Sequence, residues 1–123
     1  DYLETILMLT QRMGRVRSID VVNELGYTKA SVSIAMKKLR ENGYIAVDGE
    51  GNLTLLEPGR EIAERIYSRH RLLTHFFVQL GVEEDIAAED ACKAEHILSE
   101  QTLEKIREYA LLHDAESTLK KED

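Results

Sequence analysis

The fold of this chain is decided by residues 18–45, which read SIDVVNELGYTKASVSIAMKKLRENGYI. Ser18 is a good N-cap for a short helix, because its side chain can accept a hydrogen bond from the first turn. Gly26 can end that helix, and Tyr27-Thr28 can open the next one. Two short helices joined by a tight turn that contains glycine are typical of a helix-turn-helix.

The second helix of this motif is predicted from Lys29 to about Asn42. Its apolar residues Val32, Met36 and Leu39 are spaced to lie on one face and to be buried. A preceding helix is indicated by the apolar spacing from Tyr2 to Leu9, with its end near Met13-Gly14. The helix-turn-helix is therefore expected to rest on a third, N-terminal helix.

Two short β-prone runs, 44–47 and 53–55, follow the helix-turn-helix and flank the turn-rich loop 48–52. Three helices followed by such a hairpin predict a winged helix-turn-helix. Beyond Pro58-Gly59, a long amphipathic helix is predicted through Leu80, with further helices from Glu84 to about Leu98 and from Thr102 to about Leu112. The polar tail 114–123 is expected to be a short frayed helix or disordered.

The predicted fold class is thus mainly α, in two domains. Residues 1–59 form a winged helix-turn-helix DNA-binding domain, and residues 60–123 form a helical domain. The net charge of -7 is unevenly spread, because residues 1–60 hold eight basic and eight acidic residues whereas the remainder holds eight and 15. A neutral first half that carries a local basic stripe fits a DNA reader joined to an acidic body.

The chain holds one cysteine and no apolar run near the roughly 20 residues that span a bilayer. An internal disulfide is excluded, and no membrane partner is expected. A cytoplasmic protein is therefore predicted.

In a complex of a helix-turn-helix with DNA, the second helix of the motif is the recognition helix, and its N-terminal part faces base edges in the major groove. Lys29 can donate to guanine, whereas the apolar pair Ala30 and Ile34 can meet thymine methyl groups. Basic residues further along the helix suit phosphates, and the alternative is that they only solubilise the helix. The predicted DNA-binding residues are Thr28, Lys29, Ala30, Ser31, Ser33, Ile34, Lys37, Lys38 and Arg40.

Cys92, Glu95 and His96 stand at i, i+3 and i+4, a spacing that a continuous helix gathers onto one face. Asp1 and Glu4 repeat the i, i+3 spacing in the first helix, and His70 lies within the long amphipathic segment. Ligands from three helices could thus converge on one divalent first-row metal, which suits mixed oxygen, nitrogen and sulfur donors. Each residue also has an ordinary interpretation: acids in a first helical turn, solvated histidines, and a small buried thiol.

At this point the chain resembles the diphtheria toxin repressor family of metal-dependent bacterial regulators, especially its manganese transport regulator branch. The resemblance covers nearly the whole chain and implies a winged helix-turn-helix, a helical dimerisation domain, and metal at their junction that switches on operator binding. It rests on Asp1-Tyr2-Leu3-Glu4, residues 28–39, Glu41-Asn42-Gly43-Tyr44-Ile45, Arg69-His70-Arg71-Leu72-Leu73, Gly81-Val82 and Cys92-x-x-Glu95-His96.

Asp1, Glu4, His70, Glu95 and His96 match the manganese branch's ligands, which the resemblance implies hold two ions. Cys92 departs from that branch, which generally has a bridging Glu there. The iron-responsive branch has Cys followed by Glu-His, but it has Met where this chain has Asp1. Its second site also expects an acid and a histidine where this chain has Thr74 and Ala88.

We therefore predict one well-formed site from Asp1, Cys92, Glu95 and His96 and a weaker one from Glu4, His70 and Glu95. Hard carboxylates suit Mn²⁺ and a thiolate favours the softer Fe²⁺, Co²⁺ or Zn²⁺, so Mn²⁺ or Fe²⁺ is the expected cofactor, with Co²⁺ or Zn²⁺ possible in vitro.

The predicted function is a homodimeric, metal-activated transcriptional repressor that binds double-stranded DNA at a pseudo-palindromic operator and controls metal-uptake genes. Helical spacing makes Leu103, Ile106, Leu111 and Leu112 candidates for the dimer interface. The alternatives are a winged-helix regulator that senses a small organic ligand, or a metal-binding protein without DNA function. A metallohydrolase with Glu4 as general base is a further alternative, but the sequence lacks HExxH, nucleophile-elbow and phosphate-loop motifs, so no enzyme is expected.

Overall fold

The computed structural model describes the backbone of residues 1–122 and the side chains of residues 1–116, and within that part the chain forms six helices and one two-stranded sheet. Two compact units are present, Asp1–Ile66 and Tyr67–Asp123. The mainly α class with a small hairpin confirms the predicted fold class. The elements are α1 (Tyr2–Met13), α2 (Ser18–Leu25), α3 (Lys29–Glu41), β1 (Ile45–Val47), β2 (Leu53–Leu55), α4 (Glu57–Gln79), α5 (Glu84–Ala94) and α6 (Glu100–Glu122).

Helix α1 is capped at both ends, by the side chain of Asp1 at its start and by Gly14 at its end. Asp1 is the N-cap, and its Oδ1 accepts a hydrogen bond of 3.0 Å from the Glu4 N–H. Gly14 ends the helix with a φ of 83°, a conformation that costs glycine little. The predicted end near Met13-Gly14 is confirmed.

Helix α2 has a different N-cap from the one predicted. Arg17, not Ser18, is the N-cap, and Ser18 is already the first helical residue. The physical reason lies at Asp20, whose carboxylate accepts a hydrogen bond of 2.9 Å from the Arg17 N–H and so supplies half of a capping box one residue earlier. Gly26 ends α2 as predicted, in the left-handed conformation with a φ of 71°.

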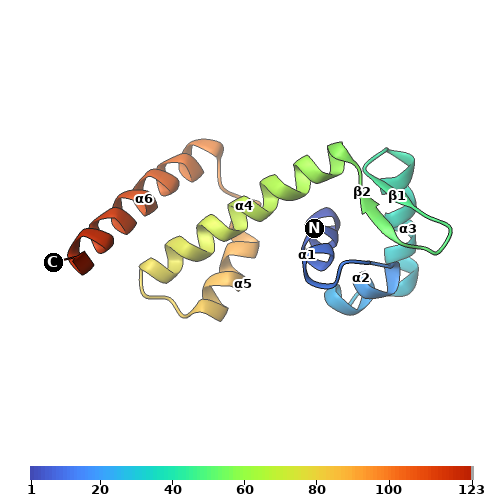
Figure 1. Cartoon of the computed structure of the whole chain (residues 1–123), viewed down its shortest axis with the longest axis horizontal. Coiled ribbons are helices and arrows are strands. Elements are labelled where there is room, and N and C mark those ends of the chain that lie inside the picture. The colour runs from blue at the N-terminus through green and yellow to red at the C-terminus, as the bar shows by residue number, and fades with distance from the viewer. Residues whose placement is uncertain (123) are drawn as a thin grey trace. The chain divides into compact units, whose positions relative to one another are not determined.

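Helix α3 follows within two residues, capped by Thr28, whose hydroxyl accepts a hydrogen bond of 3.1 Å from the Ser31 N–H. Val32 and Met36 are buried as the spacing predicts, and Leu39 is half-buried. In the first unit α3 packs against α2 and β1, while α1 packs against α2 and β2 (Figure 1). The core of this unit also contains Ile6 and Val21, both fully buried.

The hairpin pairs β1 with β2 in antiparallel register, with Ile45 opposite Leu55 and Val47 opposite Leu53. Ile45, Leu53 and Leu55 are buried, whereas Thr54 is exposed, so one face of the hairpin closes the core of the first unit. Both predicted β-prone runs are confirmed, except that Tyr44 precedes the strand. Loop 48–52, which joins the strands, is called the wing from here on.

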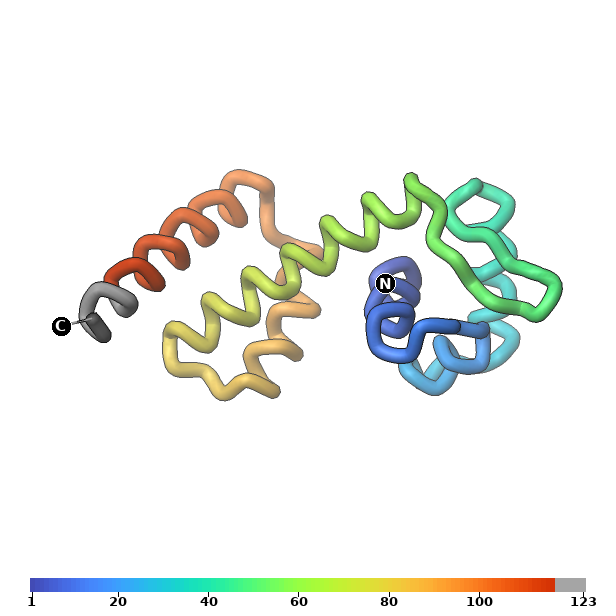
Figure 2. Tube along the Cα trace, viewed as in Figure 1, coloured from blue at the N-terminus to red at the C-terminus, as the bar shows by residue number. Residues whose placement is uncertain are grey.

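The second unit consists of the last part of α4 with α5 and α6 (Figure 2). Its core is formed by Leu73, Ala91 and Leu103, one residue from each helix, with exposures of 0–2 %. Leu103 therefore belongs to the core and is not available to a dimer interface, which corrects its candidacy. Ile106 also packs against this core, whereas Leu111 and Leu112 are 64 % and 65 % exposed.

Two predicted boundaries in this unit are wrong. Helix α5 ends at Ala94 rather than near Leu98, because the chain turns there, with the Ile97 and Leu98 N–H groups both directed to the Ala94 carbonyl. Helix α6 begins at Glu100 and runs to Glu122, well beyond the predicted end near Leu112, so residues 114–122 are helical, one of the two states predicted for the tail. The proposed division into residues 1–59 and 60–123 stays a prediction, and α4 runs through that point without a break.

No helix in the part of the chain that the structure describes is long and apolar enough to span a membrane.

Candidate metal and DNA sites

The exposed face of α3 carries the predicted DNA-binding residues and is called the reading face from here on. Val32 and Met36 turn into the core of the first unit, and this fixes which face of the helix meets solvent. Ile34 is 59 % exposed, so it is not a core residue, and its contact with DNA bases stays a prediction. The other members of the set are exposed as well, namely Thr28, Lys29, Ala30, Ser31, Ser33, Lys37, Lys38 and Arg40.

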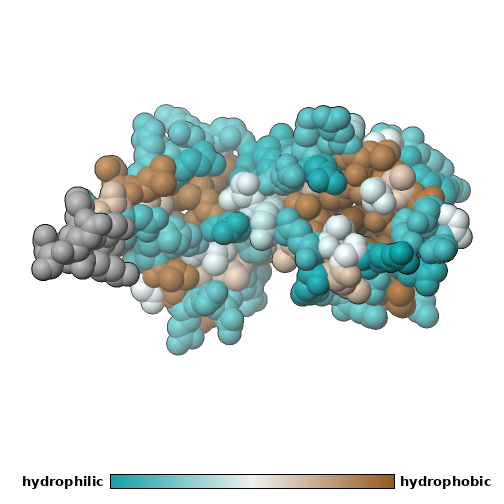
Figure 3. Space-filling model, in the orientation of Figure 1, coloured by the Kyte–Doolittle hydropathy of each residue, from teal (hydrophilic) through white to brown (hydrophobic). Residues whose placement is uncertain are grey.

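A shallow hollow of about 250 Å³ lies beside this face. Ser33, Lys37 and Arg40 line it from α3, while Ser18 lines it from the start of α2 and Val47 from β1. Lysine and arginine next to hydroxyl groups suit the phosphate oxygens of a nucleic-acid backbone. On the side of the molecule drawn in Figure 3, hydrophobic residues reach the surface between hydrophilic ones.

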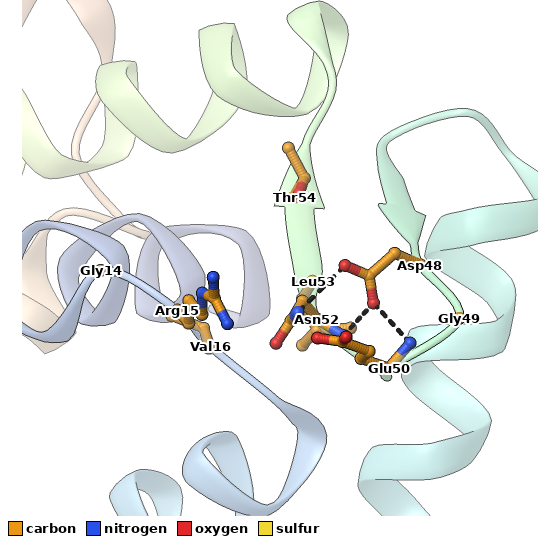
Figure 4. Close-up of a pocket in the computed structure, with 9 residues that line it drawn as sticks. All are labelled: Gly14, Arg15, Val16, Asp48, Gly49, Glu50, Asn52, Leu53 and Thr54. Carbon is orange, nitrogen blue, oxygen red and sulfur yellow. Dashed lines mark hydrogen bonds between the residues drawn. The ribbon is translucent and has the colours of Figure 1, made fainter.

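The wing borders a second open hollow of about 500 Å³, shown in Figure 4. It is lined by Gly14, Arg15, Val16, Asp48, Gly49, Glu50, Asn52, Leu53 and Thr54. The hydrogen bonds that Asn52 donates from its backbone and its side chain are the main reason why the pKa of Asp48 lies below its ordinary value. The carboxylate therefore orders the wing as an anion.

Arg15 and Arg17 were missed by the reasoning from sequence, although both line an open hollow beside Asp20, Glu50 and Asn52. The Arg17 guanidinium donates to the backbone carbonyl of Glu50, which is 33 residues further along the chain. Neither helical nor strand periodicity encodes such a contact. The residue types alone could have drawn attention to them, since both arginines stand just before a predicted helix that packs on the recognition helix.

The predicted metal ligands are divided between the two units. Asp1 and Glu4 belong to the first unit, where Asp1 is exposed and Glu4 is 7 % exposed. His70, Cys92, Glu95 and His96 belong to the second unit. In the part of the chain that the structure describes, no group of three or more His, Cys, Asp or Glu side chains is close enough to hold a metal ion.

The end of α5 departs from the predicted arrangement of Cys92, Glu95 and His96. Cys92 lies in the helix and is exposed, but Glu95 is the C-cap and His96 lies beyond the helix. The regular helix therefore ends at Ala94, and only Cys92 of the three residues lies within it. Glu95 still has helical dihedral angles, with φ -61° and ψ -22°.

Glu95 and His96 nevertheless form a close pair of possible donors. The Glu95 side chain is only 4 % exposed, and its Oε1 lies 3.0 Å from His96 Nε2, while the His96 side chain is 57 % exposed. A buried carboxylate is costly unless a cation or hydrogen-bond donors compensate it. A carboxylate and an imidazole are also donors that first-row metals accept, so this pair fits a divalent ion.

His70 of α4 is joined to α5 by its ring. Its Nε2 lies 3.0 Å from the backbone carbonyl of Ala88. A carbonyl can only accept, so Nε2 is the donor in this contact. Histidine ligands of metals typically donate their other N–H in this way, which fixes the orientation of the ring. The chemistry of His70 therefore also fits a metal ligand.

His75, which lies in the same helix as His70, has a partner of another kind. Its Nε2 lies 2.9 Å from Asp114 Oδ2, in a hydrogen bond that joins α4 and α6. Gln79 also donates to Asp114, at 2.7 Å. The hydrogen bond with His75 is the main cause that holds the pKa of Asp114 below its ordinary value. His75 thus joins two helices of the second unit.

Comparisons with known proteins match both halves of the chain. The family model described as the iron dependent repressor N-terminal DNA binding domain matches residues 1–53, and the iron dependent repressor metal binding and dimerisation domain matches residues 56–112. An uncharacterized HTH-type transcriptional regulator of Methanocaldococcus jannaschii is 34% identical over 109 residues, which cover 87% of each chain. The HTH-type transcriptional regulator MntR of Bacillus subtilis is 30% identical over 122 residues, which cover 99% of this chain and 86% of that protein.

Solved structures match the fold as well. A manganese-dependent transcriptional repressor in complex with manganese has a TM-score of 0.81 and 28% identity, and the match covers 89% of this chain and 51% of that one. The manganese regulator SloR has a TM-score of 0.76 and 25% identity, with coverages of 89% and 51%. The chain spans about half the length of these solved proteins.

Proposed function

The chain belongs to the diphtheria toxin repressor family of metal-dependent transcriptional regulators, and on that premise we propose that it is a homodimeric, metal-activated repressor of metal-uptake genes. The observation that carries the proposal is the reading face of α3, where every predicted DNA-binding side chain is exposed while Val32 and Met36 are buried. A repressor acts where its operator is, so we place the protein in the cytoplasm. We propose no catalytic role for its residues.

The DNA contact is proposed to divide into base reading and phosphate binding. Lys29, Ala30 and Ile34 read base edges from the first half of α3, where one bidentate contact gives roughly 1–3 kcal/mol of discrimination between bases. Lys37 and Arg40, beside the hollow at Ser18 and Val47, bind phosphates. Thr28, Ser31, Ser33 and Lys38 complete the surface. A dimer would present two such faces to the two halves of a pseudo-palindromic operator.

For the metal, we propose a first site from Asp1, Cys92, Glu95 and His96. The buried carboxylate of Glu95, 3.0 Å from His96 Nε2, supports it. Asp1 caps α1 through Oδ1, and a carboxylate can serve a second partner through its other oxygen. When bound, a divalent ion would supply two positive charges to these donors. A weaker second site is proposed from Glu4, His70 and Glu95, supported by the orientation that Ala88 gives to His70.

The metal is proposed to be Mn²⁺ or Fe²⁺, and Cys92 is the residue that decides between them. A thiolate favours softer ions than a carboxylate does, so ligation by Cys92 would shift the preference from Mn²⁺ toward Fe²⁺, with Co²⁺ or Zn²⁺ as substitutes in vitro. Cys92 is exposed at the end of α5, two residues before the helix ends. The test is Cys92→Glu, which should move the preference toward Mn²⁺.

The dimer is proposed to form through the second unit, which matches the dimerisation domain of the family. Leu111 and Leu112 are the candidates that remain exposed, at 64 % and 65 %. Large exposed apolar side chains close together in α6 suit the core of a homodimer interface. Light scattering at micromolar concentration should therefore report a dimer.

The deciding experiment measures binding to a labelled promoter fragment by fluorescence anisotropy under anaerobic conditions. Chelator comes first, then Mn²⁺, Fe²⁺, Co²⁺ or Zn²⁺ in turn. Metal-dependent affinity is expected, and His70→Ala should weaken it, whereas His75→Ala, a matched change in the same helix, should not. Tight binding that ignores metal would refute metal activation and favour another ligand. No binding under any condition would refute the DNA-binding function.

A further inference from the structure

The wing has an unusual charge for a segment next to a DNA-binding face. Its sequence is Asp48-Gly49-Glu50-Gly51-Asn52, with two acidic residues and no basic one. DNA carries one negative charge per 1.7 Å or so of helix axis, so an acidic loop is repelled from the phosphates. The wing of this protein therefore cannot be held against DNA by its own charge, and its position must be set from within the protein.

The wing is ordered internally by Asp48. One carboxylate oxygen, Oδ1, accepts hydrogen bonds of 2.9 Å from the N–H groups of Glu50 and Asn52, and Oδ2 accepts one of 3.0 Å from Asn52 Nδ2. The Gly51 N–H donates to the Asp48 carbonyl at 3.1 Å. Figure 4 shows the carboxylate inside the turn, with the bonds closing around it. These hydrogen bonds within the wing hold its shape.

Arg17 joins the wing to the rest of the first unit. Its Nε donates to the Glu50 carbonyl at 3.0 Å, and its Nη2 donates to the same oxygen. The guanidinium also lies close to Gly51, where an added Cβ would be 3.7 Å from Nε. The backbones of Arg17 and Asn52 form an isolated antiparallel bridge.

The position of Arg17 in the chain connects the wing to the recognition helix. Arg17 is the N-cap of α2, and α2 packs against α3. The next residue, Ser18, lines the hollow that Lys37 and Arg40 share on the reading face. The side chain of Arg17 therefore contacts the wing, while its backbone belongs to the helix-turn-helix. A substitution at Arg17 changes the contact with the wing and leaves the backbone of α2 in place.

We propose that Arg17 is a positioning residue that sets where the wing lies relative to α3, and hence how strongly the protein binds the DNA that flanks the bases under the recognition helix. Its positive charge also offsets the wing's two carboxylates. This inference rests on the proposed DNA-binding function. The competing role is a direct contact between Arg17 and a phosphate.

The test uses the full chain and three variants: Arg17→Gln, Arg17→Lys and the matched control Arg15→Gln. Arg17→Gln removes the charge and the paired donors, whereas Arg17→Lys keeps the charge and loses the forked geometry. The first measurement is amide hydrogen exchange of residues 49–53 in the protein without DNA. Loss of the Arg17 hydrogen bonds should speed exchange about tenfold in both Arg17 variants. Arg15→Gln should leave exchange unchanged, and equal melting temperatures would show that all variants fold.

The second measurement is operator affinity with the activating metal, on a long fragment and on one truncated to the bases under the recognition helices. The Arg17 variants should lose several-fold in affinity for the long fragment and match the unaltered chain on the short one. Unchanged exchange would overturn the proposal. Equal losses on both fragments, with a salt slope lower by about one in Arg17→Gln only, would instead assign a phosphate contact. If the unaltered chain binds no DNA, the proposed function fails, while the exchange result still decides whether Arg17 holds the wing.

Discussion

A methyl group added at Gly59 would collide with the backbone of Tyr44. Gly59 lies buried in the first turn of α4, and a Cβ built there would be 2.2 Å from the Tyr44 carbonyl oxygen and 3.0 Å from its carbonyl carbon. The same oxygen accepts a hydrogen bond of 3.0 Å from the Leu56 N–H. Because the obstacle is backbone, it cannot rotate away, and Gly59→Ala must displace the start of α4 from the segment between α3 and β1.

The size of the effect follows from opposing contributions. Alanine in a helix is favoured over glycine by roughly 0.5–1 kcal/mol, which would stabilise the variant if there were space. Overpacking costs about 1–3 kcal/mol, and a weakened Leu56 to Tyr44 hydrogen bond adds about 1 kcal/mol. The net expectation is a loss of about 2 kcal/mol in the free energy of unfolding, or a melting temperature lower by roughly 5–10 °C.

Thermal unfolding followed by circular dichroism checks this prediction. The matched control is Ser68→Ala, an exposed position of the same helix, where a change within about 0.5 kcal/mol is expected. A higher melting temperature for Gly59→Ala would mean that helix propensity is the only term acting. In that case the close approach of Tyr44 would be refuted.

Three further perturbations test other parts of the fold. Thr28→Ala removes the N-cap of α3 and should cost about 1 kcal/mol in urea unfolding, whereas Thr28→Ser should restore most of it. Leu73→Ala should cost about 2–5 kcal/mol, because Leu73 is fully buried among Ala91 and Leu103, while exposed Leu111→Ala should change the stability of the monomer by less than about 0.5 kcal/mol. The pKa of Asp114 is lowered, chiefly by His75, so its stabilising effect should be present above the ordinary value of 3.8 and disappear as the pH falls through the lowered value. Melting curves of the unaltered chain and Asp114→Asn should therefore converge in acid, and a constant difference down to the lowest pH would contradict this linkage.

The N-terminal half of the fold was predictable because its signals are local. Gly14 and Gly26 mark helix ends, Thr28 marks a helix start, and the apolar spacing of α3 predicts that Val32 and Met36 are buried. The end of α5 was not predictable in this way. Neither glycine nor proline stands between Ala94 and Leu98, so the spacing continues as if the helix did. The turn there depends on Leu98 packing against the core of Leu73, Ala91 and Leu103, which is a tertiary contact.

The two candidate sites differ for the same reason. The residues of the reading face can be predicted once the buried side of α3 is known, and helical periodicity gives that side. The proposed metal donors come from separate elements, so spacing within one helix could suggest Cys92, Glu95 and His96 but could not foresee that Glu95 caps the helix. Arg17 shows the limit most clearly, because its partner, the carbonyl of Glu50, carries no side-chain information at all.

The continuity of α4 decides how this protein can be dissected. The boundary between the two compact units, Ile66 to Tyr67, falls inside a helix that runs from Glu57 to Gln79. A gene fragment that stops at residue 59 or 66 would truncate a helix and leave its last four carbonyl groups without intrahelical partners. The isolated DNA-binding half should therefore be expressed through Gly81, so that the cloning boundary coincides with the natural end of α4. Shorter fragments would report on a frayed helix rather than on the wing and the reading face.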